Sequence, residues 1–123
     1  MLNVIAIFLG GGLGAITRYC VSVFMKGYDL NFPFATLGVN IFGSLILGFA
    51  AALFWKNESI HHTVKLAITV GFCGGLTTFS TFSWETFDMI KNGEFTLAVV
   101  YALISVLTCV LAISLGAFLT KYV

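Results

Sequence analysis

The sequence predicts an all-α membrane protein with four transmembrane helices, the third of them interrupted. Three observations predict this fold. The 123 residues are 59% hydrophobic and 9% charged, with a mean hydropathy of +1.05, whereas globular domains carry roughly 25% charged residues. The charged residues leave four apolar runs at about 2–25, 33–55, 63–90 and 95–120, each longer than the roughly 20 residues that a helix needs to cross a bilayer. The third run also contains Gly74-Gly75 followed by closely spaced Thr and Ser residues.

The four runs use nearly the whole chain, so we expect one four-helix transmembrane domain over residues 1–123. The first run has no basic segment before it and further spans follow at once, which favours a retained helix over a cleaved signal peptide. Within it, Gly10 and Gly14 have the small-xxx-small spacing that lets another helix approach closely. The loop from Lys26 to Phe32 ends at Pro33, which suits the first turn of the second span.

The segment from Gly71 to Ser83 predicts the break in the third helix, because a lipid-embedded helix needs neither adjacent glycines nor a cluster of hydroxyl residues. Unpaired backbone amides in lipid cost several kcal/mol each. Non-helical backbone at that depth therefore survives only where it is buried in protein or lines a wet cavity. We expect the function of the protein to reside at this break.

Polar residues recur at helical spacing on the second and fourth spans. On the second span they share one face with a small residue: Thr36, Asn40, Gly43 and Ser44. An amide such as Asn40 would contribute only about 1 kcal/mol as helix glue, and this span alone leaves helix glue and pore lining equally open. The stripe on the fourth span comprises Tyr101, Ser105, Thr108 and Cys109. Ser and Thr can bond to carbonyls of their own helix, so that stripe is weak evidence by itself.

Cysteine and histidine residues predict no metal site and no disulfide. Cys20, Cys73 and Cys109 all fall inside predicted spans, where small buried hydrophobes are expected. His61 and His62 lie beside Glu58 in a loop and are expected to be solvated. No phosphate loop, dinucleotide fingerprint or zinc spacing is present. We therefore expect neither an enzyme nor a nucleic-acid partner.

The basic residues predict insertion in both orientations, because an excess of Lys and Arg marks the cytoplasmic side. Four spans place the N-terminus, the second loop and the C-terminus on one side. That side carries Lys56, Lys65 and Lys121, and the other carries Arg18, Lys26 and Lys91. The balance favours an antiparallel dimer of oppositely inserted copies. The alternative is that the N-terminal amine or one misassigned Lys decides a single orientation.

The residues expected to contact an ion at membrane depth are Asn, Ser, Thr, Tyr and Phe, with acids and bases only at the span ends. A proton-coupled exporter needs a titratable group at depth, so this inventory argues against one. Amides, hydroxyls and phenyl ring edges present positive hydrogens, which suit a small hard anion. Arg18 can snorkel to the interface or attract anions. We expect Glu85 and Asp88 to be interfacial charges at a helix end.

Backbone carbonyls freed near Gly74 to Thr77 have the opposite polarity and suit a small hard cation. If the third spans of two antiparallel copies cross at their breaks, carbonyls from both chains meet at one point. A single ion there would have a structural role.

Three segments together resemble the Fluc (CrcB) fluoride channels over essentially the whole chain: Gly11–Ala15 with Arg18-Tyr19, Thr36–Ser44, and Gly71–Phe82. The third segment is highly specific to that family. The resemblance implies an antiparallel, dual-topology homodimer in the cell (inner) membrane with two fluoride pores. It also implies passive export of fluoride that entered a microbial cytoplasm as hydrofluoric acid.

The resemblance further implies roles for individual residues. Phe79 and Phe82 would present ring edges to fluoride, and Asn40 would be the pore amide. Thr36, Ser80 and Thr81 would belong to the polar track or its support, and Tyr101 and Ser105 would lie beside the pore on the last helix. Gly74 and Thr77 would supply backbone oxygens to a central Na⁺. Arg18 matches a basic residue of the family, Glu85 is a possible mouth residue, and Cys109 stands where a hydroxyl would be more natural.

Two alternatives remain from the residues. Small multidrug exporters also have four spans and insert both ways, but they depend on a glutamate in the first span, which this sequence lacks. A non-transporting packing subunit would explain the glycines but not the combination of Asn40, Phe79 and Phe82.

Overall fold

The computed structural model describes residues 1–26 and 32–123. Within these residues four helices are long and apolar enough to span a membrane: Leu2–Met25, Phe34–Lys56, His62–Lys91 and Phe95–Tyr122. The four predicted runs are thus confirmed to within two residues at each end. The predicted loop from Lys26 to Phe32 includes residues 27–31, which lie outside the described residues. The chain is a multi-pass membrane protein.

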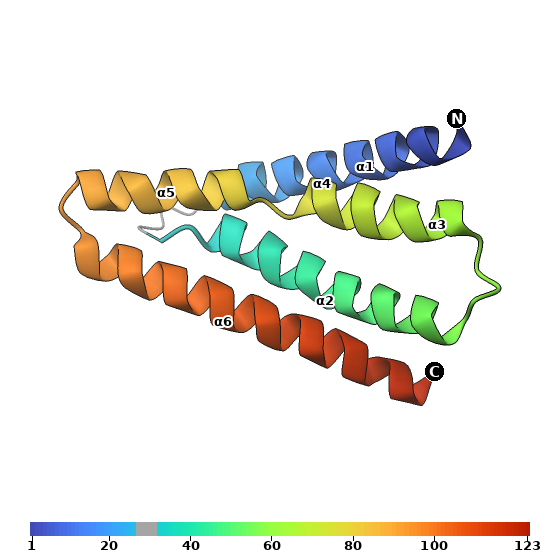
Figure 1. The fold of residues 1–123 in the computed structure, drawn as a ribbon. Helices are drawn as coiled ribbons and strands as arrows, with labels where there is room; N and C mark the ends of the chain where they lie inside the picture. The colour runs from blue at the N-terminus through green and yellow to red at the C-terminus, as the bar shows by residue number, and fades with distance from the viewer. Residues whose placement is uncertain (27–31) are drawn as a thin grey trace.

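Three spans are continuous and the third is composite (Figure 1). The continuous α-helices are α1 (Leu2–Met25), α2 (Phe34–Lys56) and α6 (Phe95–Leu119), the last followed by a 3₁₀ turn, η2 (Thr120–Tyr122). The third span comprises α3 (His62–Leu66), a π-helical segment η1 (Ala67–Cys73), α4 (Gly74–Leu76) and α5 (Phe79–Lys91). Figure 1 places the N-terminus, the α2–α3 connection and the C-terminus at one end of the bundle.

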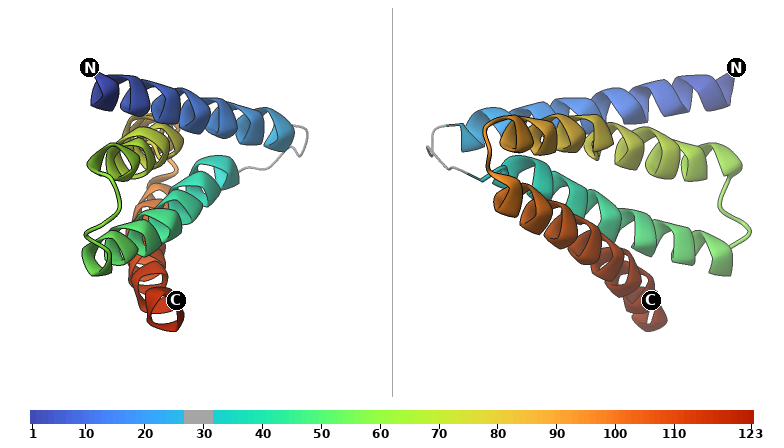
Figure 2. Two further views of the ribbon diagram at one scale, coloured as in Figure 1. Left: turned by 90° about the vertical axis from the view of Figure 1, so that its right-hand side faces the viewer. Right: turned by 60° about the vertical axis from the view of Figure 1, so that its left-hand side comes forward.

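The two halves of the third span pack against different partners. Its first half, α3 to α4, lies along α1, whereas α5 packs on α6. The most extensive helix pair is α2 with α6, and these two helices lie side by side away from α1 (Figure 2). The break therefore carries the chain from the α1 side of the bundle to the α6 side.

Glycines allow the backbones to meet where the helices pack most closely. A Cβ atom at Gly14 would overlap the Phe72 carbonyl oxygen, and one at Gly75 would overlap the Gly11 carbonyl oxygen. The packing role predicted for the small-xxx-small spacing is thus confirmed, with η1 and α4 of the same chain as its partners.

Much of the apolar surface faces outward. Between 11% and 33% of each spanning window is buried, and large side chains such as Phe8 and Leu111 are 77% and 67% exposed. A small apolar cluster of Met89, Ala98 and Tyr101 lies between α5 and α6. The outward surface requires lipid or another protein chain to cover it.

Candidate ion-conducting site

The helix break consists of Thr77 and Thr78. Both have extended backbone angles, with φ −77° and ψ 156° at Thr77 and φ −149° and ψ 118° at Thr78. The predicted break is confirmed, but the helix continues through Gly74 and Gly75. Gly75 is needed for close packing on α1, where its missing side chain admits the Gly11 backbone.

Asn40 of α2 bridges the break with both ends of its amide. Its Oδ1 accepts a hydrogen bond of 2.7 Å from the Thr78 N–H, and its Nδ2 donates one of 3.1 Å to the Thr78 carbonyl oxygen. The first bond satisfies the Thr78 N–H, which the break leaves without a helical partner. The second adds a donor to the Thr78 carbonyl, which as the N-cap carbonyl of α5 also begins that helix. Because an amide nitrogen carries two hydrogens, Asn40 keeps one N–H beyond this bridge.

Thr78 also caps α5. Its Oγ1 accepts the Thr81 N–H at 3.1 Å and donates to the Thr81 hydroxyl at 3.0 Å, and it lies 3.3 Å from the Ser80 hydroxyl. A threonine side chain that accepts an N–H of the first helical turn is a standard N-cap. Ser80 and Thr81 thus gather around the start of α5.

Arg18 contacts the same break from α1. Its Nη1 donates a hydrogen bond of 3.1 Å to the Thr77 carbonyl oxygen. The Arg18 side chain is half-buried. We expected it either to reach the membrane interface or to attract anions, and neither expectation predicts a hydrogen bond to the break.

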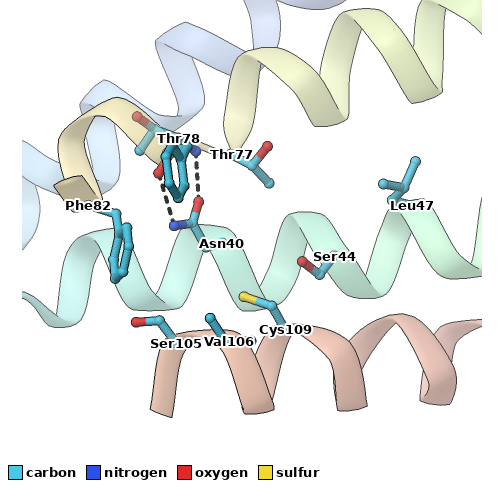
Figure 3. Close-up of a pocket in the computed structure, with 10 residues that line it drawn as sticks. Asn40, Ser44, Leu47, Thr77, Thr78, Phe82, Ser105, Val106 and Cys109 are labelled. Atoms are coloured by element: carbon cyan, nitrogen blue, oxygen red, sulfur yellow. Dashed lines mark hydrogen bonds between the residues drawn. The ribbon is translucent and has the colours of Figure 1, made fainter. Parts of the chain in front are cut away.

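A pocket of about 280 Å³ opens beside the break between α2, α5 and α6. We call it the inner pocket, and its lining residues are Asn40, Ser44, Leu47, Thr77, Thr78, Phe79, Phe82, Ser105, Val106 and Cys109 (Figure 3). The Phe79 and Phe82 ring centroids are 5.6 Å apart. Phe82 packs on Tyr101 at 5.1 Å, whereas Phe79 is 79% exposed. Asn40, Ser105 and both phenylalanines therefore meet at one cavity.

Glu85 occupies a different place from the helix-end position that we expected. Its Oε1 accepts a hydrogen bond of 2.7 Å from the Thr36 hydroxyl, and its Oε2 accepts one of 2.7 Å from the Tyr101 hydroxyl. Both donors are buried, Thr36 at 5% and Tyr101 at 0% exposed. The carboxylate thus connects α2, α5 and α6, a role that the sequence did not predict.

Two further pockets extend from the break toward the bundle end where α2 begins. An end pocket of about 450 Å³ is lined by Lys26, Thr36, Thr81 and Glu85 among others. A pocket of about 250 Å³ beside Arg18 shares Thr36 and Thr81 with it. Thr78 lines both this Arg18 pocket and the inner pocket. Neighbouring pockets from the bundle end to the inner pocket therefore share polar lining residues.

Not every predicted site residue reaches the inner pocket. Ser80 and Gly74 do not line it, and Tyr101 lies behind Phe82. Ser105 does line it, although its Oγ is buried.

The break offers backbone oxygens to a cation, but one chain offers few. The Thr78 N–H would bond to the Gly74 carbonyl oxygen in a continuous helix, and here it bonds to Asn40 instead. The Gly74 carbonyl therefore fits an oxygen ligand for Na⁺, whereas the Thr77 carbonyl is shared with Arg18. The described residues contain no group of three or more His, Cys, Asp or Glu that could hold a metal ion.

Comparison with known proteins gives one consistent result. Residues 5–117 match the family model of the CrcB-like protein, Camphor Resistance (CrcB). A fluoride-specific ion channel FluC of Geobacter metallireducens is 38% identical over 123 residues, which covers 99% of both chains. The channels of the same name from Pyrococcus abyssi and Serratia proteamaculans are 39% and 44% identical, covering 94% and 76% of this chain and 93% and 73% of their own. The chain belongs to the CrcB/FluC family of fluoride-specific ion channels.

Proposed function

We propose that the protein is a fluoride-specific ion channel that lets fluoride leave the cell passively. Its relatives carry that name, and membership of a channel family means that the chain is not an enzyme. The observation that carries the proposal is the inner pocket, which is lined by the Asn40 amide, by hydroxyl-bearing side chains and by two phenyl rings. Such donors can replace the water around a small anion without holding it too tightly to leave.

The linked pockets suggest the route. Fluoride would enter at the end pocket, where Lys26 offers a positive charge, and pass the Arg18 pocket to reach Thr78. It would then contact the free N–H of Asn40 and the edges of Phe79 and Phe82, with Ser105 beside the path. Thr36, Ser80 and Thr81 would support this track, with Thr36 and Tyr101 holding the Glu85 carboxylate beside the mouth.

We further propose that two copies pair antiparallel in the cell (inner) membrane and form two pores. One chain leaves Phe79 79% exposed beside the inner pocket, so a second chain is needed to close the wall. Gly12, Gly38 and Gly74 have nothing within 4 Å of the position that a Cβ atom would take. These open glycines supply the close-approach surface that a second chain requires.

Pairing would also complete a sodium site. The Gly74 and Thr77 carbonyls of two chains would give four oxygens around one structural Na⁺, and oxygen is the ligand type that hard cations prefer. The Arg18 hydrogen bond to Thr77 must then be shared or released. Replacement of Na⁺ by N-methylglucamine should lower the dimer fraction of the purified protein, and an unchanged dimer fraction would contradict this site.

Proteoliposomes that contain the purified protein and either fluoride or chloride test the function. We expect rapid fluoride loss once a potassium ionophore relieves the membrane voltage, with negligible chloride loss. The family membership distinguishes the chain from the small multidrug exporters. Cation transport driven by a proton gradient would instead support an exporter. Intact pairing without any fluoride loss would instead support a packing subunit.

A further inference from the structure

We propose that Gly43 of α2 is a positioning residue for the inner pocket. Because it has no side chain, it leaves space for the methyl group of Thr77, and this contact fixes the first residue of the helix break beside the pocket. The contact follows from the geometry of one chain. Only its effect on efflux rests on the proposed channel function.

Gly43 faces the break from the side of α2 that also carries Asn40. The two residues are three positions apart, which places them on one face of the helix. Gly43 is buried, and a Cβ atom built on it would overlap the Thr77 Cγ2 atom. Carbon atoms make favourable contact at about 3.5–4.0 Å. Position 43 therefore has no room for a side chain while the Thr77 methyl stays where it is.

The Thr77 side chain cannot turn away from α2 without a loss, because its hydroxyl is engaged. Its Oγ1 donates a hydrogen bond of 2.8 Å to the Cys73 carbonyl oxygen, which also accepts the Thr77 N–H at 2.9 Å. In Figure 3 the Thr77 hydroxyl lies on the side of the residue that faces away from α2. Methyl and hydroxyl are both attached to Cβ, so a rotation that moves the methyl also takes the hydroxyl off the Cys73 carbonyl.

The other response to a larger residue at position 43 is that the break moves away from α2. Asn40 holds the next residue of the break, with hydrogen bonds of 2.7 and 3.1 Å to the Thr78 backbone, and this movement would lengthen them. Thr77 and Thr78 both line the inner pocket. Either response therefore changes the wall of the pocket, and Asn40 and Gly43 together hold consecutive residues of the break.

A cycle of substitutions tests the contact through rescue. Gly43→Ala introduces the Cβ atom, and Thr77→Ser removes the methyl but keeps the hydroxyl. We expect Gly43→Ala to slow fluoride efflux per folded protein at least about tenfold beside Thr77, and less than about twofold when the variant and its reference both carry Thr77→Ser. Gly11→Ala is the matched control, since its Cβ would meet only the Gly71 carbonyl oxygen, at 3.9 Å. Equal slowing in the two backgrounds overturns the proposal.

Amide hydrogen exchange measures the same contact without transport. The Thr78 N–H is bonded to Asn40, so we expect Gly43→Ala to speed its exchange at least about tenfold and added Thr77→Ser to reverse this change. Unchanged Thr78 exchange alongside slow efflux overturns the role of the break. If Gly43→Ala does not fold, failure of Thr77→Ser to restore folding also overturns the proposal. Absence of efflux from the unsubstituted protein would count against the channel function alone, and the exchange result would still decide the contact.

Discussion

At the scale of single residues, Asn40 combines a structural and a chemical role. Its amide holds both backbone polar groups of Thr78 and still has one N–H beside the inner pocket. The sequence left helix glue and pore lining open for this residue. The contacts show that Asn40 holds helices together through the broken backbone of the same chain. Pore lining by Asn40 remains a proposal.

Asn40→Asp tests the amide chemistry of this residue, because the side-chain volume hardly changes while the N–H donor is lost. The carboxylate can still accept the Thr78 N–H, but it faces the Thr78 carbonyl with a negative charge and presents no N–H to an anion. We expect fluoride efflux to be abolished and the free energy of unfolding to fall by about 1–3 kcal/mol. Asn57→Asp is the control, because Asn57 is exposed and its side chain bonds only to its own helix at Leu53. Normal efflux through Asn40→Asp would refute the pore assignment.

Phe79 provides a residue-scale prediction in which folding is spared. Its ring is 79% exposed in one chain and contacts Phe82, so Phe79→Ile removes a ring edge with little loss of internal packing. We expect slower fluoride efflux with dimer assembly and thermal midpoint nearly unchanged. Phe87→Ile is the matched control, since Phe87 is a half-exposed phenylalanine of the same helix that pairs with Trp84 instead. Equal efflux in the two variants would contradict the role of Phe79.

At the scale of elements, hydropathy was sufficient to predict the four spans, because the length of a spanning helix is set by the bilayer. The sequence placed the break within Gly71 to Ser83 but did not single out Thr77 and Thr78. Where the helix stops depends on Asn40, which lies 38 residues away and takes the Thr78 N–H. Glu85 escaped prediction for the same reason, since its hydroxyl donors Thr36 and Tyr101 come from two other helices.

Two adjacent glycines allow a prediction at this scale. A Cβ at Gly75 would overlap the Gly11 backbone, so we expect Gly75→Ala to separate α1 from α4 and lower stability by about 1–3 kcal/mol. A Cβ at Gly74 meets nothing within 4 Å in one chain, and alanine favours helix over glycine by up to about 1 kcal/mol. Gly74→Ala should therefore leave the single chain folded and lower only the dimer fraction. An unaffected dimer fraction would show that the partner does not pack on Gly74.

At the scale of the whole molecule, the basic residues do not all act as free surface charges. Arg18 donates to the Thr77 carbonyl inside the bundle. Lys56 donates to the Thr120 carbonyl, and Lys65 donates to the Phe54 carbonyl at 3.1 Å. Phe54 lies near the C-terminal end of α2, where the helix dipole stabilises a positive charge. Because Arg18 lies inside the bundle, the basic residues left at the two bundle ends are Lys56, Lys65 and Lys121 against Lys26 and Lys91. This difference is small enough for few substitutions to decide the orientation.

Two matched pairs of exposed substitutions test insertion in both orientations. Asn92→Lys with Glu94→Lys adds positive charge at the α5–α6 turn, and Asn57→Lys with Glu58→Lys adds it at the opposite end. Because positive loops stay in the cytoplasm, we expect each double variant to insert in one direction only. Each alone should then lose fluoride efflux from cells, while co-expression of the two should restore it through oppositely oriented partners. A reporter fused to the C-terminus would read the orientations directly. Full efflux from either double variant alone, with its reporter on one side only, would show that antiparallel pairing is not required.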